Sequence, residues 1–133
     1  MNRLLAVASI FLATHAFPAQ AAFSGADLLK RCSAAEKSVT GAQLNAEEML
    51  DSMWCAGYMS GLLDGFGVAE FKVGNERMIC PGENGLTRSQ AMTIITGYLR
   101  EHPEEQAKSG RRIALVALSK TFPCPKPPRS ASD

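Results

Sequence analysis

Few residues in this chain of 133 could carry out acid–base or nucleophilic chemistry. Ser60 and Ser89 lie in segments with helical patterns, and neither has the context of a nucleophile elbow. His102 is one of only two histidines, and because Pro103 follows it, we expect it to end a helix. Asp51 and Asp64 lie about four helical turns apart, which is too far for one acid–base couple. These residues do not predict an enzyme.

The cysteines are the other residues that could take part in chemistry. The four, Cys32, Cys55, Cys80 and Cys124, contain no Cys-x-x-Cys pair, which argues against a zinc site and a thioredoxin-like redox site. No glycine-rich phosphate loop follows a strand pattern. We therefore expect no metal and no cofactor.

The N-terminus predicts an exported protein. Arg3 supplies a positive start, residues 4–17 are mainly apolar, and Ala19-Gln20-Ala21 is a small-x-small cleavage motif. We expect a signal peptide at residues 1–21, cleavage after Ala21, a periplasmic mature protein and no membrane segment after cleavage. An even number of cysteines in a small exported chain predicts two disulfides.

The mature chain has the size of one domain. Cleavage leaves 133 − 21 = 112 residues, and removal of Arg3 leaves 13 basic against 13 acidic residues. This zero net charge gives no reason to expect nucleic acid or an anionic membrane as a partner. We assign residues 22–128 to a single helical domain and 129–133 to a disordered tail.

Three capping boxes predict where helices begin: Ser24 with Asp27, Asn45 with Glu48, and Thr87 with Gln90. Apolar residues at helical spacing follow each box. The expected helices cover about 24–38, 45 to Gly65 or Gly67, 88–100 and 110–120, with a short turn of helix at 103–106. The fold class is therefore all-α, a compact bundle of about four helices in two hairpins stapled by two disulfides.

Four cysteines allow three pairings, and hairpin geometry favours one. Partners in an antiparallel hairpin lie equally far from the turn. The midpoint of Cys32 and Cys55 falls close to the first turn, near residues 42–43, and that of Cys80 and Cys124 is residue 102, close to the second turn near 104. We predict the pairs Cys32–Cys55 and Cys80–Cys124.

The apolar stretch at residues 53–66 organises the chain. It carries Gly57, Gly61 and Gly65 at intervals of four, which place the glycines on one face of a helix. Since a helical glycine costs about 1 kcal/mol relative to alanine, we expect a buried central helix with Gly61 facing a neighbouring helix at close range. A small-residue dimer seam is the alternative interpretation.

Two irregular segments, 68–86 and 101–112, are candidates for binding because loops on a rigid scaffold often carry function. The second joins two well-defined helices, so we expect a charged tip that projects from fixed ends. A solvated loop without a partner is the alternative. The candidate partner-binding residues are Glu101, Glu104, Glu105, Lys108, Arg111 and Arg112.

An ordered set of motifs runs along the chain between Cys32 and Cys124. The motifs are Cys55-x-Gly57-Tyr58-x-x-Gly61-x-x-Asp64-Gly65, Cys80-Pro81, Thr87-x-x-Gln90, Tyr98-Leu99-x-x-His102-Pro103, Ala117-Leu118 and Phe122-Pro123-Cys124. This set resembles the Rap/Tai family of immunity proteins. These positions resemble scaffold positions, so the contact residues do not transfer from the family.

The resemblance implies a small, helical, disulfide-bonded periplasmic protein. Such proteins neutralise peptidoglycan amidase effectors delivered by type VI secretion, often as homodimers with a protruding segment in the amidase groove. Three alternatives stay open: a periplasmic acid-stress chaperone, a stand-alone helical binding module of unknown partner, and a small enzyme or enzyme subunit.

Overall fold

The computed structural model describes residues 23–73 and 77–125. These ranges form four α-helices and one 3-10 helix, with no strand: α1 (Gly25–Val39), α2 (Ala46–Val73), α3 (Arg88–Glu101), η1 (Pro103–Glu105) and α4 (Gly110–Thr121). The predicted all-α fold is confirmed. The predicted signal peptide at 1–21 and the predicted tail at 129–133 lie outside the described residues. Within the described ranges, no helix combines the length and apolar character needed to cross a membrane.

Three helices begin where the capping boxes predict. The Ser24 hydroxyl accepts from the Asp27 N–H at 3.2 Å, and the Asp27 carboxylate accepts from the Ser24 N–H at 3.0 Å. Asn45 and Glu48 make the same reciprocal pair at 2.9 and 3.1 Å, and Thr87 and Gln90 repeat it before α3. Each box satisfies amides that the first helical turn leaves unpaired, so these local signals decide the starts of α1, α2 and α3.

Helix α2 is longer than expected. The prediction that it ends near Gly65 or Gly67 is wrong, because the helix continues to Val73. A glycine ends a helix by adopting a left-handed conformation, and among the described glycines only Gly41 and Gly85 have a positive φ. By contrast, the prediction that His102 ends α3 is confirmed: its N–H donates to the Tyr98 carbonyl at 3.0 Å.

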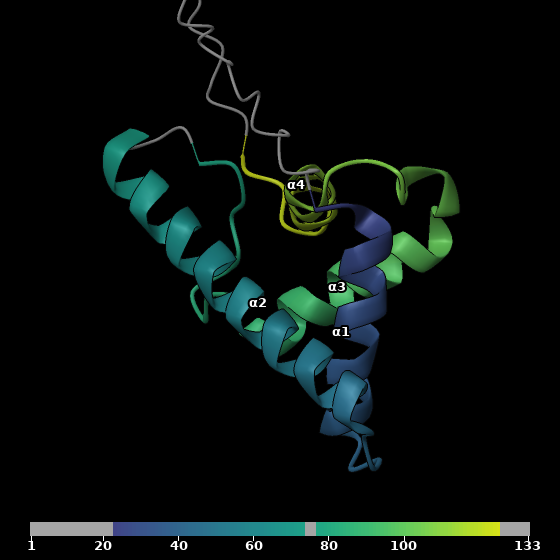
Figure 1. Cartoon of the computed structure of the whole chain (residues 1–133). Helices are drawn as coiled ribbons and strands as arrows, with labels where there is room; N and C mark the ends of the chain where they lie inside the picture. Colours follow the sequence, from purple (N-terminus) through teal and green to yellow (C-terminus); the bar gives the residue numbers. More distant parts are fainter. Residues whose placement is uncertain (1–22, 74–76, 126–133) are drawn as a thin grey trace, which may run out of the picture.

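The helices surround one core (Figure 1). Helix α1 packs along the N-terminal half of α2, and the C-terminal half of α2 extends away toward the upper left of the view. Helix α3 packs against both α1 and α2, and α4 packs against α3 and α1. The largest fully buried apolar side chains come from all four helices: Leu28, Met59, Ile95, Leu99, Ile113 and Leu118.

Both predicted disulfides are confirmed. Cys32–Cys55 joins α1 to α2 with 5.1 Å between the Cα atoms, and Cys80–Cys124 joins the segments before α3 and after α4 with 4.9 Å. The Cys80 N–H also donates to the Phe122 carbonyl at 2.9 Å. The two bonds therefore close the two helical hairpins, and each restrains a loop of the unfolded chain.

Candidate partner-binding surfaces

The predicted charged segment, residues 101–112, is held against the start of α1. The Gly25 N–H donates to the Lys108 carbonyl at 2.8 Å, and the Ala26 N–H donates to the Gln106 carbonyl at 2.9 Å. The Gly110 N–H donates to the Phe23 carbonyl at 2.6 Å. The first two bonds satisfy first-turn amides of α1, and the third satisfies a first-turn amide of α4. The segment is therefore a fixed corner of the molecule, and it projects less freely than a loop attached only at its two ends.

The structure brings four side chains of this corner together in two pairs. Lys108 Nζ lies 2.5 Å from Glu105 Oε1, and Glu104 Oε1 lies 3.2 Å from His102 Nδ1. The Glu104 backbone N–H and the His102 ring hold the pKa of the Glu104 carboxyl below its usual value. The Lys108–Glu105 pair neutralises charge within the segment itself.

The remaining candidates, Glu101, Arg111 and Arg112, are exposed. Among the residues that the structure describes, none of the three makes an ion pair. The two arginines occupy the first turn of α4, which contains no acidic residue. Because the N-terminus of a helix carries partial positive charge, arginines there do not stabilise α4. Their charges are available to an external acidic group.

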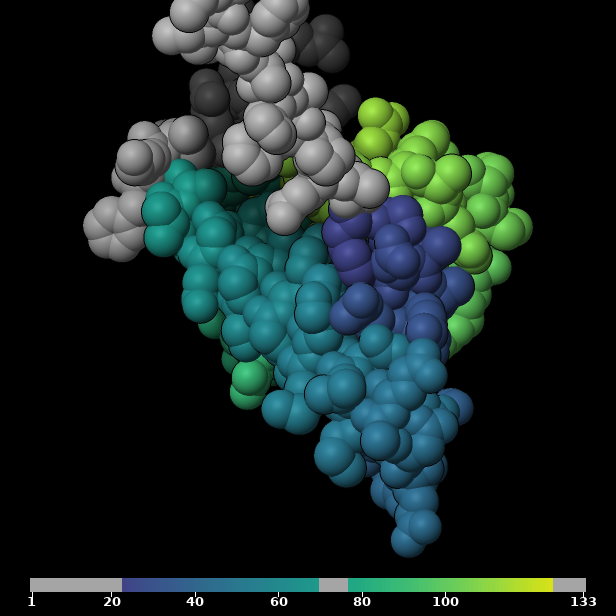
Figure 2. Space-filling model, viewed as in Figure 1, coloured from purple at the N-terminus to yellow at the C-terminus, as the bar shows by residue number. Residues whose placement is uncertain are grey.

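The outer face of α2 is exposed, which corrects the prediction of a buried central helix. A Cβ added at Gly57, Gly61 or Gly65 would meet no atom within 4 Å, so Gly61 does not face a neighbouring helix. Leu50 and Met53 are 68% and 66% exposed. The reason is that α1 and α3 pack on the inner side of α2, and no described element covers the side that carries the glycines. Figure 2 shows α2 running across this face from the α1–α2 turn at the bottom.

Aromatic side chains fasten α2 to the start of α1. The Trp54 ring lies 4.2 Å from the Phe23 ring and stacks on the Tyr58 ring at 5.2 Å, measured between centroids. The Arg31 guanidinium lies over Trp54 at 4.8 Å. Burial raises the pKa of the Tyr58 hydroxyl, which has no hydrogen-bond partner in the described part of the chain. Sequence reasoning missed this cluster, whose only local signal is the Trp-x-x-x-Tyr spacing.

Two of the residues that could do chemistry, Ser60 and Asp51, have structural partners, and Asp64 and Ser89 are exposed. Ser60 donates to the Ala56 carbonyl at 3.0 Å and accepts from Arg88 at 3.2 Å. Asp51 is nearly buried and lies within ion-pair distance of Lys30 and Arg31. Within the described ranges, no group of histidine, cysteine or acidic residues is arranged to hold a metal ion. The Ser60–Arg88 contact joins α2 to α3, and the Asp51 contacts join α2 to α1.

Comparison with known proteins gives one family. Neither the curated proteins nor the solved structures contain a match to this chain. The model of the Rap1a immunity proteins matches residues 24–124, which run from the cap of α1 to the last disulfide cysteine. The match thus covers the whole helical scaffold and both cross-links, and the chain belongs to the Rap1a immunity protein family.

Proposed function

We propose that this protein is a periplasmic immunity protein that binds and inhibits a peptidoglycan amidase delivered by type VI secretion. The observation that carries the proposal is the family match over residues 24–124. Immunity proteins act by binding a partner effector. We propose two details beyond the family: the effector is a peptidoglycan amidase, and the compartment is the periplasm. Two disulfides support the compartment, because such bonds persist in oxidising environments such as the periplasm.

The decisive experiment uses a candidate peptidoglycan amidase effector, sought first among the neighbouring genes. The amidase is directed to the periplasm of a sensitive strain with and without the full-length protein. We expect lysis without the protein and growth with it. The matched control is the same protein without residues 1–21, which should stay in the cytoplasm and fail to protect. Lysis despite periplasmic expression of the folded protein would refute the proposal.

We assign the contact with the effector to the charged corner, residues 101–112. Its backbone is held by α1, so little conformational freedom is lost on binding. Glu101, Arg111 and Arg112 present charges without an internal ion pair among the described residues. Charges at such a rim favour specificity and fast association more than raw affinity.

The arginines give a test that separates binding from folding. Arg111→Glu with Arg112→Glu places acids in the first turn of α4, where the helix dipole favours them, so stability should stay equal or rise. Affinity for the amidase should fall, mainly through a slower association rate. Lys120→Glu at the other end of α4 is the charge control, with its melting temperature measured because this change also removes the contact of Lys120 with the Tyr98 ring. Unchanged association of the folded double variant would move the contact elsewhere, with residues 68–86 the next candidate.

The exposed outer face of α2 supports a second proposal, that two copies of the chain form a homodimer there. Met49, Leu50, Met53 and Val68 are exposed apolar residues of one helix, and the open glycines let another backbone approach closely. Sedimentation equilibrium should show a dimer that Met53→Lys converts to a monomer. A monomer that suppresses aggregation of unfolded proteins would instead favour the chaperone alternative.

A further inference from the structure

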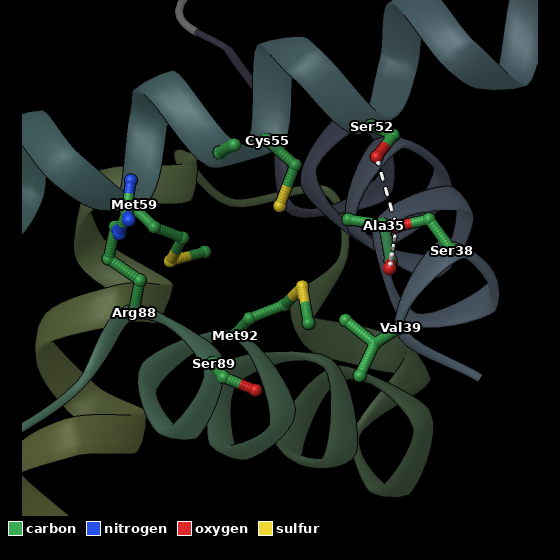
Figure 3. Close-up of a pocket in the computed structure, with 10 residues that line it drawn as sticks. Ala35, Ser38, Val39, Ser52, Cys55, Met59, Arg88, Ser89 and Met92 are labelled. Atoms are coloured by element: carbon green, nitrogen blue, oxygen red, sulfur yellow. Dashed lines mark hydrogen bonds between the residues drawn. The ribbon is translucent and has the colours of Figure 1, made fainter. Parts of the chain in front are cut away.

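A cavity of about 170 Å³ opens between α1, α2 and the start of α3. Figure 3 shows side chains from these three helices turned toward one space, with Cys55 and Met59 from α2 and Met92 from α3. All three are buried, with exposed fractions of 0%, 1% and 6%. The floor of the cavity is therefore apolar, and its mouth is open to solvent.

The cavity is held in shape by covalent and polar contacts. Cys55 forms the disulfide with Cys32, which fixes α2 against α1 directly behind the floor. At the edge, the Ser38 and Ser52 hydroxyls lie 3.4 Å apart. Methionine side chains are flexible enough to adjust to the shape of an incoming group. The site is therefore present before any partner arrives.

Its volume matches one side chain. A cavity of about 150 Å³ lined by apolar side chains holds one benzene molecule, so this one has room for a single leucine, methionine or phenylalanine side chain. Protein interfaces commonly gain most of their affinity from such a side chain buried in a pocket and surrounded by a ring of weaker contacts.

The mouth of the cavity is positively charged. Arg88 lines it and occupies the first position of α3, whose first turn contains no acidic residue. Arg88 donates to the Ser60 hydroxyl at 3.2 Å. No carboxylate among the described residues forms an ion pair with it. Since the N-terminal end of a helix is also partially positive, Arg88 and α3 together favour a carboxylate.

We propose that this cavity receives one aliphatic or aromatic side chain of the effector, with a carboxylate of the same effector segment paired to Arg88. This inference rests on the proposed function and adds a second contact, apart from the charged corner. The effector segment is defined by its chemistry: a bulky apolar residue beside an aspartate, a glutamate or a chain terminus.

The first test does not need the effector. Methionine methyl groups are labelled with ¹³C, and the protein is titrated with N-acetyl-leucine or with the neutral N-acetyl-leucinamide. Signals of Met59 and Met92 should shift while those of the exposed Met49 and Met78 stay in place. The acid should bind about two- to fivefold more tightly than the amide, and Arg88→Gln should abolish that preference. Equal binding of acid and amide, or no selective shift, would overturn the proposal.

The second test measures affinity for the amidase that the parent protein neutralises in the protection experiment. Ala56 is an exposed residue on the lining of the cavity, so Ala56→Leu should fill the space and weaken binding about tenfold or more. Ala46→Leu adds the same atoms to an exposed position of α2 outside the cavity and should bind as the parent does. Arg88→Glu should also weaken binding while leaving the melting temperature equal or higher, because an acid suits the start of α3.

The outcomes separate this inference from the proposed function. If the parent protein binds the amidase and Ala56→Leu binds equally well, the cavity does not contact the effector and the inference is wrong. If the parent binds no amidase, the proposed function fails, and the inference as stated fails with it. A selective response of Met59 and Met92 would then show only that the cavity accepts an apolar group beside a carboxylate.

Discussion

Replacing Gly61 by alanine should make the protein more stable. Gly61 lies inside α2 with no positive φ, so its backbone already has the conformation that alanine prefers. A Cβ at this position would meet no atom within 4 Å. The substitution therefore adds no steric conflict and removes only the conformational freedom that glycine has in the unfolded chain.

The expected size follows from helix propensity. Glycine in a helix interior is about 0.8–1.0 kcal/mol less favourable than alanine, so Gly61→Ala should raise the free energy of unfolding by about that amount. A gain of about 1 kcal/mol raises the melting temperature by roughly 4–8 °C in a domain of about 60–100 residues, and this domain is slightly larger. A Cβ at Gly57 or Gly65 would also meet no atom within 4 Å, so Gly57→Ala and Gly65→Ala should raise the free energy of unfolding by a similar amount.

The assay is thermal unfolding followed by circular dichroism, at low protein concentration so that any homodimer is dissociated. Gly25→Ala is the matched control, because its Cβ would lie 2.9 Å from Leu99 Cδ2 and 3.1 Å from backbone atoms of Gln106. That clash should cost about 1–3 kcal/mol. Gly85→Ala is a second control, destabilising because Gly85 has a φ of +66°.

A lower melting temperature for Gly61→Ala, comparable to that of Gly25→Ala, would refute the reasoning. It would mean that another element packs on the outer face of α2 in the monomer. At high concentration the variant has a second readout. If the homodimer uses this face, Gly61→Ala should weaken dimerisation even while it stabilises the monomer.

Three further predictions concern processing, the second disulfide and pH. N-terminal sequencing of periplasmic protein should begin at Ala22, and a retained Met1 would contradict the predicted signal peptide. Replacing Cys80 and Cys124 together by serine should lower the free energy of unfolding by about 2–4 kcal/mol in urea titrations, and an unchanged value would contradict it. Hydrogen bonds from the Ser24 hydroxyl and N–H lower the pKa of the Asp27 carboxyl. The contribution of the Asp27 carboxylate to stability is therefore present above the pKa of the unfolded chain and is lost as the pH falls through the lower pKa of the folded protein. Asp27→Ala should destabilise at neutral pH but lose that effect well below about pH 4, and a difference independent of pH would argue against this role.

Local signals in the sequence were sufficient for the helix starts and the cross-links. A capping box involves residues three apart, so Ser24 with Asp27 forms whenever the helix does. The disulfide pairs followed from distance to each turn, because antiparallel helices place equidistant residues side by side. The order of the same motifs along the chain also indicated the family.

The extent and exposure of α2 could not be predicted in the same way. Its residues are apolar nearly all round, so the pattern does not say which side faces the core. Gly65 and Gly67 would end the helix only in a left-handed conformation. Neither has a positive φ, and α2 continues to Val73.

The candidate sites also differ in how much of each could be predicted from the sequence. By itself the sequence determined four helices, two cross-links and a charged segment at 101–112, since each depends on neighbours or on simple distance along the chain. Only the tertiary structure decided that this segment is bound to α1, that the outer face of α2 is uncovered, and that Met59 and Met92 line a cavity beside Arg88. The physical reason is that burial depends on how many elements pack around a helix, and residues far apart in sequence form those contacts.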